Sequence, residues 1–375
     1  MNQTYSKIPP TALPKSALDK IAWLQLTRSR RVGPATFVRL VNEYGTCAGA
    51  LRGLPKIAKE AGAKEYTPFD AKAAEREFDH GLSLGLTPLF LGHNDYPTLL
   101  AESPDAPAFL WAKGNITLAS NTCVSLVGAR NASSLGTRLA KRIAQELGEM
   151  GYTVVSGLAR GIDSAVHEGS LETGTIAVQA GGINVPYPKE NTKLQSVIGE
   201  TGLCVSEQPI GLIPQARHFP QRNRIIAGLS LAVVVIEGAA RSGSLITARS
   251  AADLGRDVMA VPGSPLDPRA AGCNMLIRDG STLVRSATDI HEALEIPTME
   301  QQPTLFNEAS LEVAHISDDA IAQKILATLS VNAIAEDIVI RDTGLAPNEV
   351  ARHITTLELS GKVQRGAGGF LSLAS

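Results

Sequence analysis

Short, almost wholly apolar segments recur through the middle of this 375-residue chain, and helix-like stretches separate them. The segments are residues 124–127, 153–156, 175–179, 203–206, 231–236, 258–261 and 282–285. Strands that are apolar along their whole length are buried on both faces, which is typical of a parallel sheet covered by helices on either side. Between the first two segments Leu135, Leu139, Ile143 and Leu147 recur every four residues, as in an amphipathic helix. The sequence therefore predicts an α/β fold with a parallel sheet at its core.

Glycine, arginine and serine gather at or just after the ends of these strands. The residues are Gly128, Arg130, Ser156, Gly157, Arg160, Arg241, Ser242 and Gly243. Open parallel sheets bind their ligands at the carboxyl ends of the strands. A glycine turn at this edge leads into a helix N-terminus, whose unpaired amides and dipole favour an anion. A tight turn explains any single glycine but not so many arginines and serines beside them, so we predict a site for phosphate groups.

None of the glycine turns matches a dinucleotide-binding GxGxxG fingerprint. Gly238-Ala-Ala-Arg-Ser-Gly243 has the outer spacing of a P-loop, but Ser244 stands where lysine is required and Leu245 where Ser or Thr would bind Mg²⁺. Gly81-Leu-Ser-Leu-Gly85 spells a nucleophile elbow, yet it precedes a predicted strand instead of joining a strand to a helix. The sequence therefore argues against a P-loop hydrolase and against an α/β-hydrolase.

The segment Phe219-Pro-Gln-Arg-Asn-Arg-Ile-Ile226 places polar side chains beside an apolar run that must be buried. Arginine holds phosphate oxygens in bidentate geometry, and asparagine can bond a phosphate or a base edge. Arg217 adds positive charge just upstream, and the Phe219 ring can stack on a base. We therefore expect Arg222 and Asn223 to face a ligand.

The same segment also has a structural interpretation. One of its arginines can pair with Glu207 or Glu237, each of which follows a predicted strand, and so join strands together. We expect both roles within the segment, with Arg224 structural and Arg222 facing the ligand.

The amino-acid composition restricts which partners the protein can bind and in which cellular compartment we expect it. The formal net charge of −2 gives no general attraction to polyanions, so nucleic-acid binding requires a local basic patch. Only 4% of the residues are aromatic, so a nucleic-acid site cannot depend on many stacking rings. The four cysteines are isolated, which predicts buried thiols, a reducing compartment and no metal site. No signal-like or membrane-spanning apolar run is present, and we expect a cytoplasmic protein without a cofactor.

Further domains are predicted on both sides of the sheet. Near the N-terminus Gly33-Pro34 separates two helical segments, and this turn either presents amides to DNA phosphates or is simply a turn, which we favour. A polar stretch suits a linker, and three helices followed by a β-hairpin indicate a winged helix. The predicted ranges are 1–80 for a helical domain, 81–296 for the sheet domain, 297–316 for the linker and 317–375 for the winged helix.

Acid–base catalysis has candidate residues in this chain. Asp163 and His167 lie four apart in a predicted helix, and Glu207 and Glu237 lie at strand ends, so together they could hydrolyse an N-glycosidic or phosphate bond. We favour structural roles instead, with Asp163 as a helix cap and His167 in a satisfied polar contact.

The predicted recognition helix of the winged helix is nearly neutral, because it carries Glu349, Arg352, His353 and Glu358. Helices that read DNA sequence usually bring more arginine and lysine to the phosphates. A protein–protein or dimerisation role is therefore at least as well supported as duplex binding.

With these residues laid out, the chain resembles the DprA (Smf) family of DNA-processing proteins over nearly its whole length. The motifs that carry the resemblance are Val127-Gly-Ala-Arg130, Ser156-Gly-Leu-Ala-Arg-Gly-Ile-Asp163, Pro186-Tyr-Pro-Lys-Glu-Asn191, Ser206-Glu-Gln-Pro209, Phe219-Pro-Gln-Arg-Asn-Arg-Ile-Ile226 and Glu237-Gly-Ala-Ala-Arg-Ser-Gly-Ser-Leu-Ile-Thr247. The family pattern usually has serine or threonine where Ala129 stands, and Gly-Ser/Cys-Gly where this chain has Ala180-Gly-Gly182. Ala129 therefore removes one hydroxyl from the first motif.

The resemblance implies a Rossmann-like core, SAM-like helices before it, a winged helix after it, and no catalysis. Such proteins bind and protect incoming single-stranded DNA, form dimers through the Rossmann-like domain and load the recombinase RecA during natural transformation. The residues carried over as DNA contacts are Arg130, Ser156, Gly157, Phe219, Arg222, Asn223 and Arg224.

Two alternatives remain open. The same Rossmann variant occurs in nucleotide phosphoribohydrolases, although their Pro-Gly-Gly-x-Gly-Thr loop is replaced here by Glu237-Gly-Ala-Ala-Arg-Ser-Gly243. The other is a sequence-specific regulator acting through the winged helix, against which its near-neutral recognition helix argues.

Overall fold

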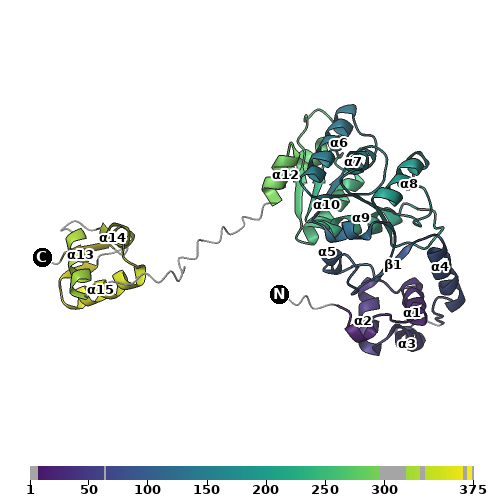
Figure 1. Cartoon of the computed structure of the whole chain (residues 1–375), viewed down its shortest axis with the longest axis horizontal. Coiled ribbons are helices and arrows are strands. Elements are labelled where there is room, and N and C mark those ends of the chain that lie inside the picture. The colour runs from purple at the N-terminus through teal and green to yellow at the C-terminus, as the bar shows by residue number, and fades with distance from the viewer. Residues whose placement is uncertain (1–6, 63–64, 295–317, 330–333, 366–369, 374–375) are drawn as a thin grey trace. The chain divides into compact units, whose positions relative to one another are not determined.

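The computed structural model describes residues 7–62, 65–294, 318–329, 334–365 and 370–373. The chain forms two compact units, residues 1–297 and residues 298–375 (Figure 1). The predicted linker, residues 297–316, lies outside the described residues.

Four helices open the first unit: α1 (Ala17–Arg28), α2 (Pro34–Tyr44), α3 (Cys47–Glu60) and α4 (Ala71–Ser83), after the 3-10 turn η1 (Pro10–Ala12). A capping box fixes the start of α1, because Ser16 Oγ accepts from the Asp19 amide and the Asp19 carboxylate accepts from the Ser16 amide. Gly33 is the N-cap of α2 and Pro34 its first residue, so the expected turn is present.

Buried side chains connect these helices to the sheet through hydrogen bonds. Trp23 of α1 is fully buried and donates from Nε1 to the Ala108 carbonyl at 2.8 Å. Glu77 of α4 pairs with Arg28 at 2.8 Å and accepts from Trp111 Nε1 at 3.1 Å. The first helices and the sheet therefore share one core.

Nine strands form one sheet in the order β1-β2-β6-β5-β4-β3-β7-β8-β9. They are β1 (Thr87–Phe90), β2 (Phe109–Gly114), β3 (Cys123–Val127), β4 (Thr153–Ser156), β5 (Thr175–Val178), β6 (Leu203–Ser206), β7 (Ala232–Val235), β8 (Asp257–Ala260) and β9 (Thr282–Leu283). Strands β3 to β9 run parallel, as predicted. The sheet is nevertheless mixed, because β2 pairs antiparallel with both β1 and β6. The predicted parallel core is confirmed; β1 and β2 precede it in the chain, and the sequence does not predict their antiparallel pairing, because β6 lies far away from β2 in the sequence.

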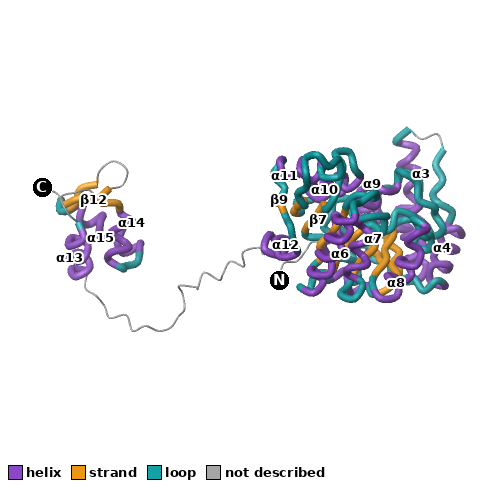
Figure 2. Tube along the Cα trace, turned by 90° about the horizontal axis from the view of Figure 1, so that it is seen from above, coloured by secondary structure: helices purple, strands orange, loops and turns teal. Residues whose placement is uncertain are grey.

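Alternate residues of the central strands enter two separate apolar cores. In β7, Val233 and Val235 belong to one core, and Ala232 and Val234 to the other. The first core is covered by α9 (His218–Leu229), α10 (Gly243–Asp253) and α11 (Ala271–Arg278), and the second by α6 (Ser134–Glu149), α7 (Ile162–Ser170) and α12 (Ala287–Leu294). Figure 2 shows α6 and α12 on one side of the strands and α10 and α11 on the other.

The remaining helices of the first unit are α5 (Thr98–Ala101), η2 (Ile116–Ser120), η3 (Lys189–Asn191) and α8 (Thr192–Thr201). Helix α8 packs against β2 and β6. In α6, Ile143 and Leu147 are fully buried, as predicted, whereas Leu135 is 69% exposed, so the prediction that it belongs to the apolar face is wrong.

The strand order creates a crevice at one edge of the sheet. From β3 the chain moves outward through β4 and β5 to β6, then returns to place β7 on the other side of β3. After β3 the chain enters α6 on one face, and after β7 it enters α10 on the opposite face. The loops after β3 and β7 therefore diverge at a topological switch point, where folds of this kind bind ligands.

The second unit is a winged helix, as predicted. Its elements are α13 (Asp318–Thr328), β10 (Ile334–Ala335), α14 (Glu336–Thr343), α15 (Pro347–Leu359), β11 (Val363–Arg365) and β12 (Phe370–Leu373). Strands β11 and β12 form the expected hairpin, and β10 adds a third strand in the order β10-β12-β11. Ile325, Val339, Ile354 and Leu371 are its fully buried centre.

Candidate functional site

A groove of about 810 Å³ lies at the carboxyl ends of β3 and β7, at the switch point. We call it the outer groove. Its walls include Gly128, Ala129, Arg130 and Asn131 after β3, Phe219, Arg222 and Asn223 of α9, and Ser242, Gly243 and Ser244 at the start of α10. Seven of the thirteen residues that the sequence predicts for the site line this groove: Gly128, Arg130, Phe219, Arg222, Asn223, Ser242 and Gly243.

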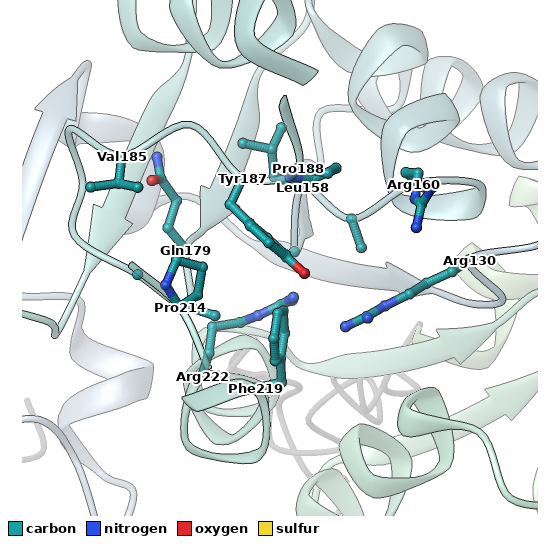
Figure 3. A pocket seen from close by; sticks show the side chains of 14 residues that line it. Arg130, Leu158, Arg160, Gln179, Val185, Tyr187, Pro188, Pro214, Phe219 and Arg222 are labelled. Carbon is teal, nitrogen blue, oxygen red and sulfur yellow. The ribbon is translucent and has the colours of Figure 1, made fainter. Parts of the chain in front are cut away.

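A smaller cavity of about 30 Å³ adjoins the outer groove, and we call it the inner pocket. It is lined by Gly157–Arg160 after β4, by residues 179–181, 185, 187 and 188, and by Pro214. Arg130, Phe219 and Arg222 line both spaces, so the two are adjacent. Figure 3 shows the side chains of Tyr187, Phe219, Arg222 and Arg130 converging at the inner pocket.

Arg222 lies at the centre of the site and is only 6% exposed. Its Nη1 is 3.9 Å from Asp163 Oδ2, and its Nε is buried without a hydrogen-bond partner. Burial lowers the pKa of Arg222 to about 10, while Asp163 acts in the opposite direction, so the guanidinium stays charged at neutral pH. Burial raises the pKa of Asp163, and Arg222 opposes that shift. Arg222 thus places a guanidinium at the junction of groove and pocket, and Asp163 compensates its charge.

Arg130 is exposed, and its guanidinium lies over the Phe219 ring, 4.5 Å from the ring centre. The Tyr187 ring packs against Phe219 with 5.7 Å between centres. A cation on an aromatic face is a favourable contact of about 0.5–1 kcal/mol at exposed sites. Arg130 and Tyr187 therefore occupy the ring surface on which a base would stack.

The loop after β4 is held rigidly against α7. Leu158 has a positive φ of 55°, and its amide donates to His167 Nε2 at 3.2 Å. The Ala159 amide donates to Asp163 at 3.4 Å, and Asn191 Nδ2 donates to the Leu158 and Ala159 carbonyls. These bonds fix the wall of the inner pocket that faces Arg222.

His167 is fully buried, and its role is structural, as expected. Because Nε2 accepts from Leu158, the proton of the neutral ring lies on Nδ1 and is donated to Thr175 Oγ1 at 2.8 Å. Burial lowers the pKa of His167 to about 3, with Arg222 as a second cause. Asp163 lies in the first turn of α7 but the N-cap is Gly161, so the predicted cap is wrong in position, although its carboxylate does accept from a loop amide.

The start of α10 opens into the outer groove. Ser242 is its N-cap without a side-chain capping bond; instead Ser242 Oγ and Ser244 Oγ share a hydrogen bond. Asn223 Nδ2 donates to the Gly243 carbonyl at 3.3 Å and ties α9 to this turn. The first amides of α10 therefore face a space large enough for an anion.

The remaining predicted residues do not line the outer groove. Arg160 is exposed at the rim of the inner pocket, 3.6 Å from Glu190, and Gly157 forms part of the pocket wall. Ser156 is fully buried and donates to the Leu126 carbonyl at 2.7 Å, so its side chain does not face the groove. Arg217 and Arg241 are exposed near the ends of α9 and α10 and line neither space.

Arg224 points away from the groove. It pairs with Glu207 at 2.6 Å and with Asp105 at 3.7 Å, which is the structural role expected for it. It lines a different cleft together with Arg28 and Pro34. Glu237 instead accepts from the Ser133 amide at 2.9 Å and so anchors the start of α6.

Sequence reasoning did not assign Tyr187 and Asn191 to the site, and it favoured a structural role as a helix cap for Asp163, which lines the outer groove. Tyr187 and Asn191 belong to the Pro186–Asn191 motif, whose two prolines predict a fixed turn but not where that turn lies. Among the residues that the structure describes, no cluster of His, Cys, Asp or Glu could hold a metal ion. No described helix is long and apolar enough to cross a membrane.

The fold and the site define a Rossmann-like α/β protein with an arginine-lined groove at its switch point and a separate winged helix. Family models match along nearly the whole chain: a DprA-like N-terminal HHH domain at residues 17–79, DNA recombination-mediator protein A at residues 87–295, and a DprA winged helix domain at residues 309–369. The chain belongs to the DprA (Smf) family of DNA recombination-mediator proteins.

Relatives with different degrees of sequence identity support this assignment to the family. DNA processing protein DprA of Streptococcus pneumoniae is 47% identical over 197 residues, covering 52% of this chain and 70% of its own. Its X-ray structure matches with a TM-score of 0.61 over 74% of this chain and 98% of that chain. Protein Smf of Synechocystis is 31% identical over 93% of this chain and 98% of its own. A solved structure of DNA processing protein A from Helicobacter pylori concerns the single-stranded DNA binding mode of that protein. It matches with a TM-score of 0.51 and 25% sequence identity, and the match covers 56% of this chain and 95% of that chain.

Proposed function

We propose that this protein binds single-stranded DNA along the outer groove, protects an incoming strand during natural transformation and loads RecA recombinase onto it. The observation that carries the proposal is the buried cation Arg222, which joins the groove to a pocket beside an aromatic ring. The binding mode described for the Helicobacter pylori relative supports single-stranded DNA as the ligand.

The groove offers separate contacts for phosphate and base. Arg130 and Arg222 can hold phosphate oxygens through their guanidinium forks, and the first amides of α10 can hold a neighbouring phosphate. The Phe219 ring can stack on a base once Arg130 leaves its face, a contact of about 1–3 kcal/mol that tolerates any sequence. This combination of positive charge and stacking is typical of single-strand binding sites.

We propose that the site is not catalytic. Asp163 is the one carboxylate among the described residues that line the outer groove, and it is committed to Arg222 and the Ala159 amide. His167 is buried behind the loop and bonded at both ring nitrogens. A nucleotide phosphoribohydrolase would need an acid or base free to reach its substrate, and release of free base from nucleoside monophosphates would support that alternative.

We further propose that the protein acts in the cytoplasm as a dimer formed through the Rossmann-like unit. The winged helix would serve a protein contact. On α15 and its neighbours, Arg365 is neutralised by Glu336 at 2.7 Å and Glu358 at 2.9 Å, which leaves little positive charge for a DNA backbone. Sedimentation of the whole protein and capture of purified RecA test these two contacts.

The deciding experiment compares a labelled oligo-dT strand with its matched duplex across a salt series. We expect tighter binding of the single strand and a log–log salt slope of about −0.7 per phosphate contacted. Arg130→Ala should weaken binding and reduce the slope, whereas the control Arg278→Ala, at an exposed arginine of α11, should change neither. A duplex preference, or no binding at low salt, would contradict the proposal.

A further inference from the structure

Helix α8 and the antiparallel edge of the sheet enclose a separate cavity of about 260 Å³, which we call the α8 cleft. Lys113 of β2 and Cys204 of β6 are paired across the two strands, and both line the cleft. The cleft shares no lining residue with the outer groove or with the inner pocket. Because a cavity of ~150 Å³ can hold a benzene ring, the α8 cleft has room for one large side chain.

The cleft has apolar walls and an exposed apolar rim. Leu86 and Ile183 line it and are buried, and Leu84, which ends α4, lines it and is 39% exposed. Leu82 of α4 and Val197 of α8 are 49% and 39% exposed and lie within two residues of lining positions. Exposed apolar side chains that gather around a cavity are typical of an interaction site. We therefore expect a ligand that fills the cleft with an apolar group and continues beyond it.

Lys113 supplies positive charge to the cleft. It is exposed, and it forms no ion pair with any residue that the structure describes. Its stem lies against α8, where a Cβ on Gly199 would be 3.3 Å from Cδ of the lysine. Burial raises the pKa of Cys204 to about 11, and Lys113 is among the groups that oppose this shift, so its charge acts on the cleft. Glu200 accepts from Ser196 Oγ at 3.3 Å but does not line the cleft. The cleft therefore favours an anionic group.

Gln195 of α8 adds a hydrogen-bond acceptor that lacks a donor. Its Nε2 donates to the Ile183 carbonyl at 2.9 Å and to Gln179 Oε1 at 3.3 Å, whereas its Oε1 is buried and has no partner among the described residues. A buried acceptor without a donor is unfavourable, and an N–H group brought by a ligand would relieve it. The cleft thus suits a ligand with an anion, an apolar group and an N–H. The last residue of a polypeptide carries all three.

We propose that the α8 cleft binds the carboxyl terminus of a partner protein whose last residue has a large apolar side chain. The terminal carboxylate pairs with Lys113, the side chain fills the cleft, and the preceding residues cover the exposed Leu82 and Val197. Capture of a terminal carboxylate is a recurring mode of peptide recognition. A free organic acid would lack the N–H and would leave the rim uncovered. The inference does not depend on DNA binding, because no residue of the cleft lines the outer groove.

Three short fluorescein-labelled peptides test the proposal with the full-length protein. The first ends in phenylalanine with a free carboxylate, the second is its carboxyl-terminal amide, and the third ends in alanine with a free carboxylate. We expect the first to bind about tenfold tighter than either of the others in fluorescence anisotropy, which is the usual effect of one charged hydrogen bond or one buried side chain. Equal affinities, or no binding of the first peptide, would overturn the proposal. Phenylacetate binding as tightly as the first peptide would also overturn it, because the cleft would then take a small acid.

Two variants at exposed positions locate the effect in the cleft. Lys113→Met keeps the stem and removes the charge, so it should abolish the preference for the free carboxylate over the amide. Lys72→Met, at an exposed lysine of α4, should keep that preference.

Ser196→Phe fills the cleft from α8 and should abolish binding of the first peptide. Thr201→Phe adds a ring at an exposed position of the same helix that does not line the cleft, and binding should persist. Unchanged oligo-dT affinity in every variant would show that each one folds. A preference for the free carboxylate that persists in Lys113→Met would overturn the proposal.

Discussion

Gly157 and Arg222 fit together so closely that a Cβ on the glycine would overlap with Nη1 of the arginine. Gly157 directly follows β4, whose end leads to the inner pocket, and Arg222 belongs to α9. Glycine is therefore required here for close approach and not for a special backbone angle. The contact sets the position of the cation that the groove and pocket share.

Gly157→Ala should push Arg222 away from Asp163 and from the pocket. Forcing a methyl group into a packed site costs about 1–3 kcal/mol, so we expect a lower free energy of unfolding together with weaker binding of oligo-dT. Urea unfolding and anisotropy measure the two effects. Gly243→Ala is the matched stability control, because no atom lies within 4 Å of a Cβ at that position. Unchanged stability of Gly157→Ala would show that Arg222 can move at no cost.

Asp163→Ala should be more damaging to stability than to DNA binding. Removing one partner of a buried ion pair leaves an uncompensated charge, which typically costs about 3–5 kcal/mol. Arg222 is 6% exposed and would be left with that charge. Denaturant unfolding checks the loss, and the double variant Asp163→Ala, Arg222→Met should recover part of it. A double variant no more stable than Asp163→Ala would contradict the pairing.

The strands could be predicted from sequence because a strand buried on both faces is apolar along its length, as in β7. The sequence does not predict helix α8, because its segment is mostly polar and buries few residues. Ile198 is one of these buried residues. The antiparallel edge could not be predicted either, because the pairing of Trp111 with Ser206 depends on how distant segments meet.

The sequence predicts which types of residue form the site, but it predicts only part of their arrangement in space. Residues two apart on a helix point about 200° away from each other, so Arg222 and Arg224 of α9 had to face opposite sides. Arg224 pairs with Glu207, which lies on the side of α9 away from the groove, so Arg222 faces the groove. The position of Glu207 follows from the strand order. The approach of Tyr187 to Phe219 joins two loops, and no local pattern in either loop predicts it.

Arg224→Ala and Arg130→Ala should therefore have opposite effects. Arg224 is paired with Glu207 at 2.6 Å on the far side of α9, so its loss should lower stability and leave oligo-dT affinity unchanged. Arg130 is exposed in the groove, so its loss should weaken binding and leave stability unchanged. Thermal unfolding and anisotropy on the two variants measure both properties. A loss of affinity in Arg224→Ala at unchanged stability would place the DNA path on the wrong side of α9.

Acidification should destabilise the first unit through His167. Burial holds the pKa of His167 at about 3, whereas an unfolded histidine titrates near ~6.5. Between these values the unfolded chain binds the proton and the folded chain does not, so stability present above pH ~6.5 is lost as the pH falls toward 3. The slope from one such group is at most ~1.4 kcal/mol per pH unit.

The measurement is urea unfolding at a series of pH values between 7 and 4 for the wild type and for His167→Gln. The glutamine amide can accept from Leu158 and donate to Thr175 without titrating, so its stability should depend less on pH. His80→Gln, at an exposed position of α4, should keep the wild-type dependence. Equal pH dependence in His167→Gln and the wild type would mean that another group controls acid unfolding.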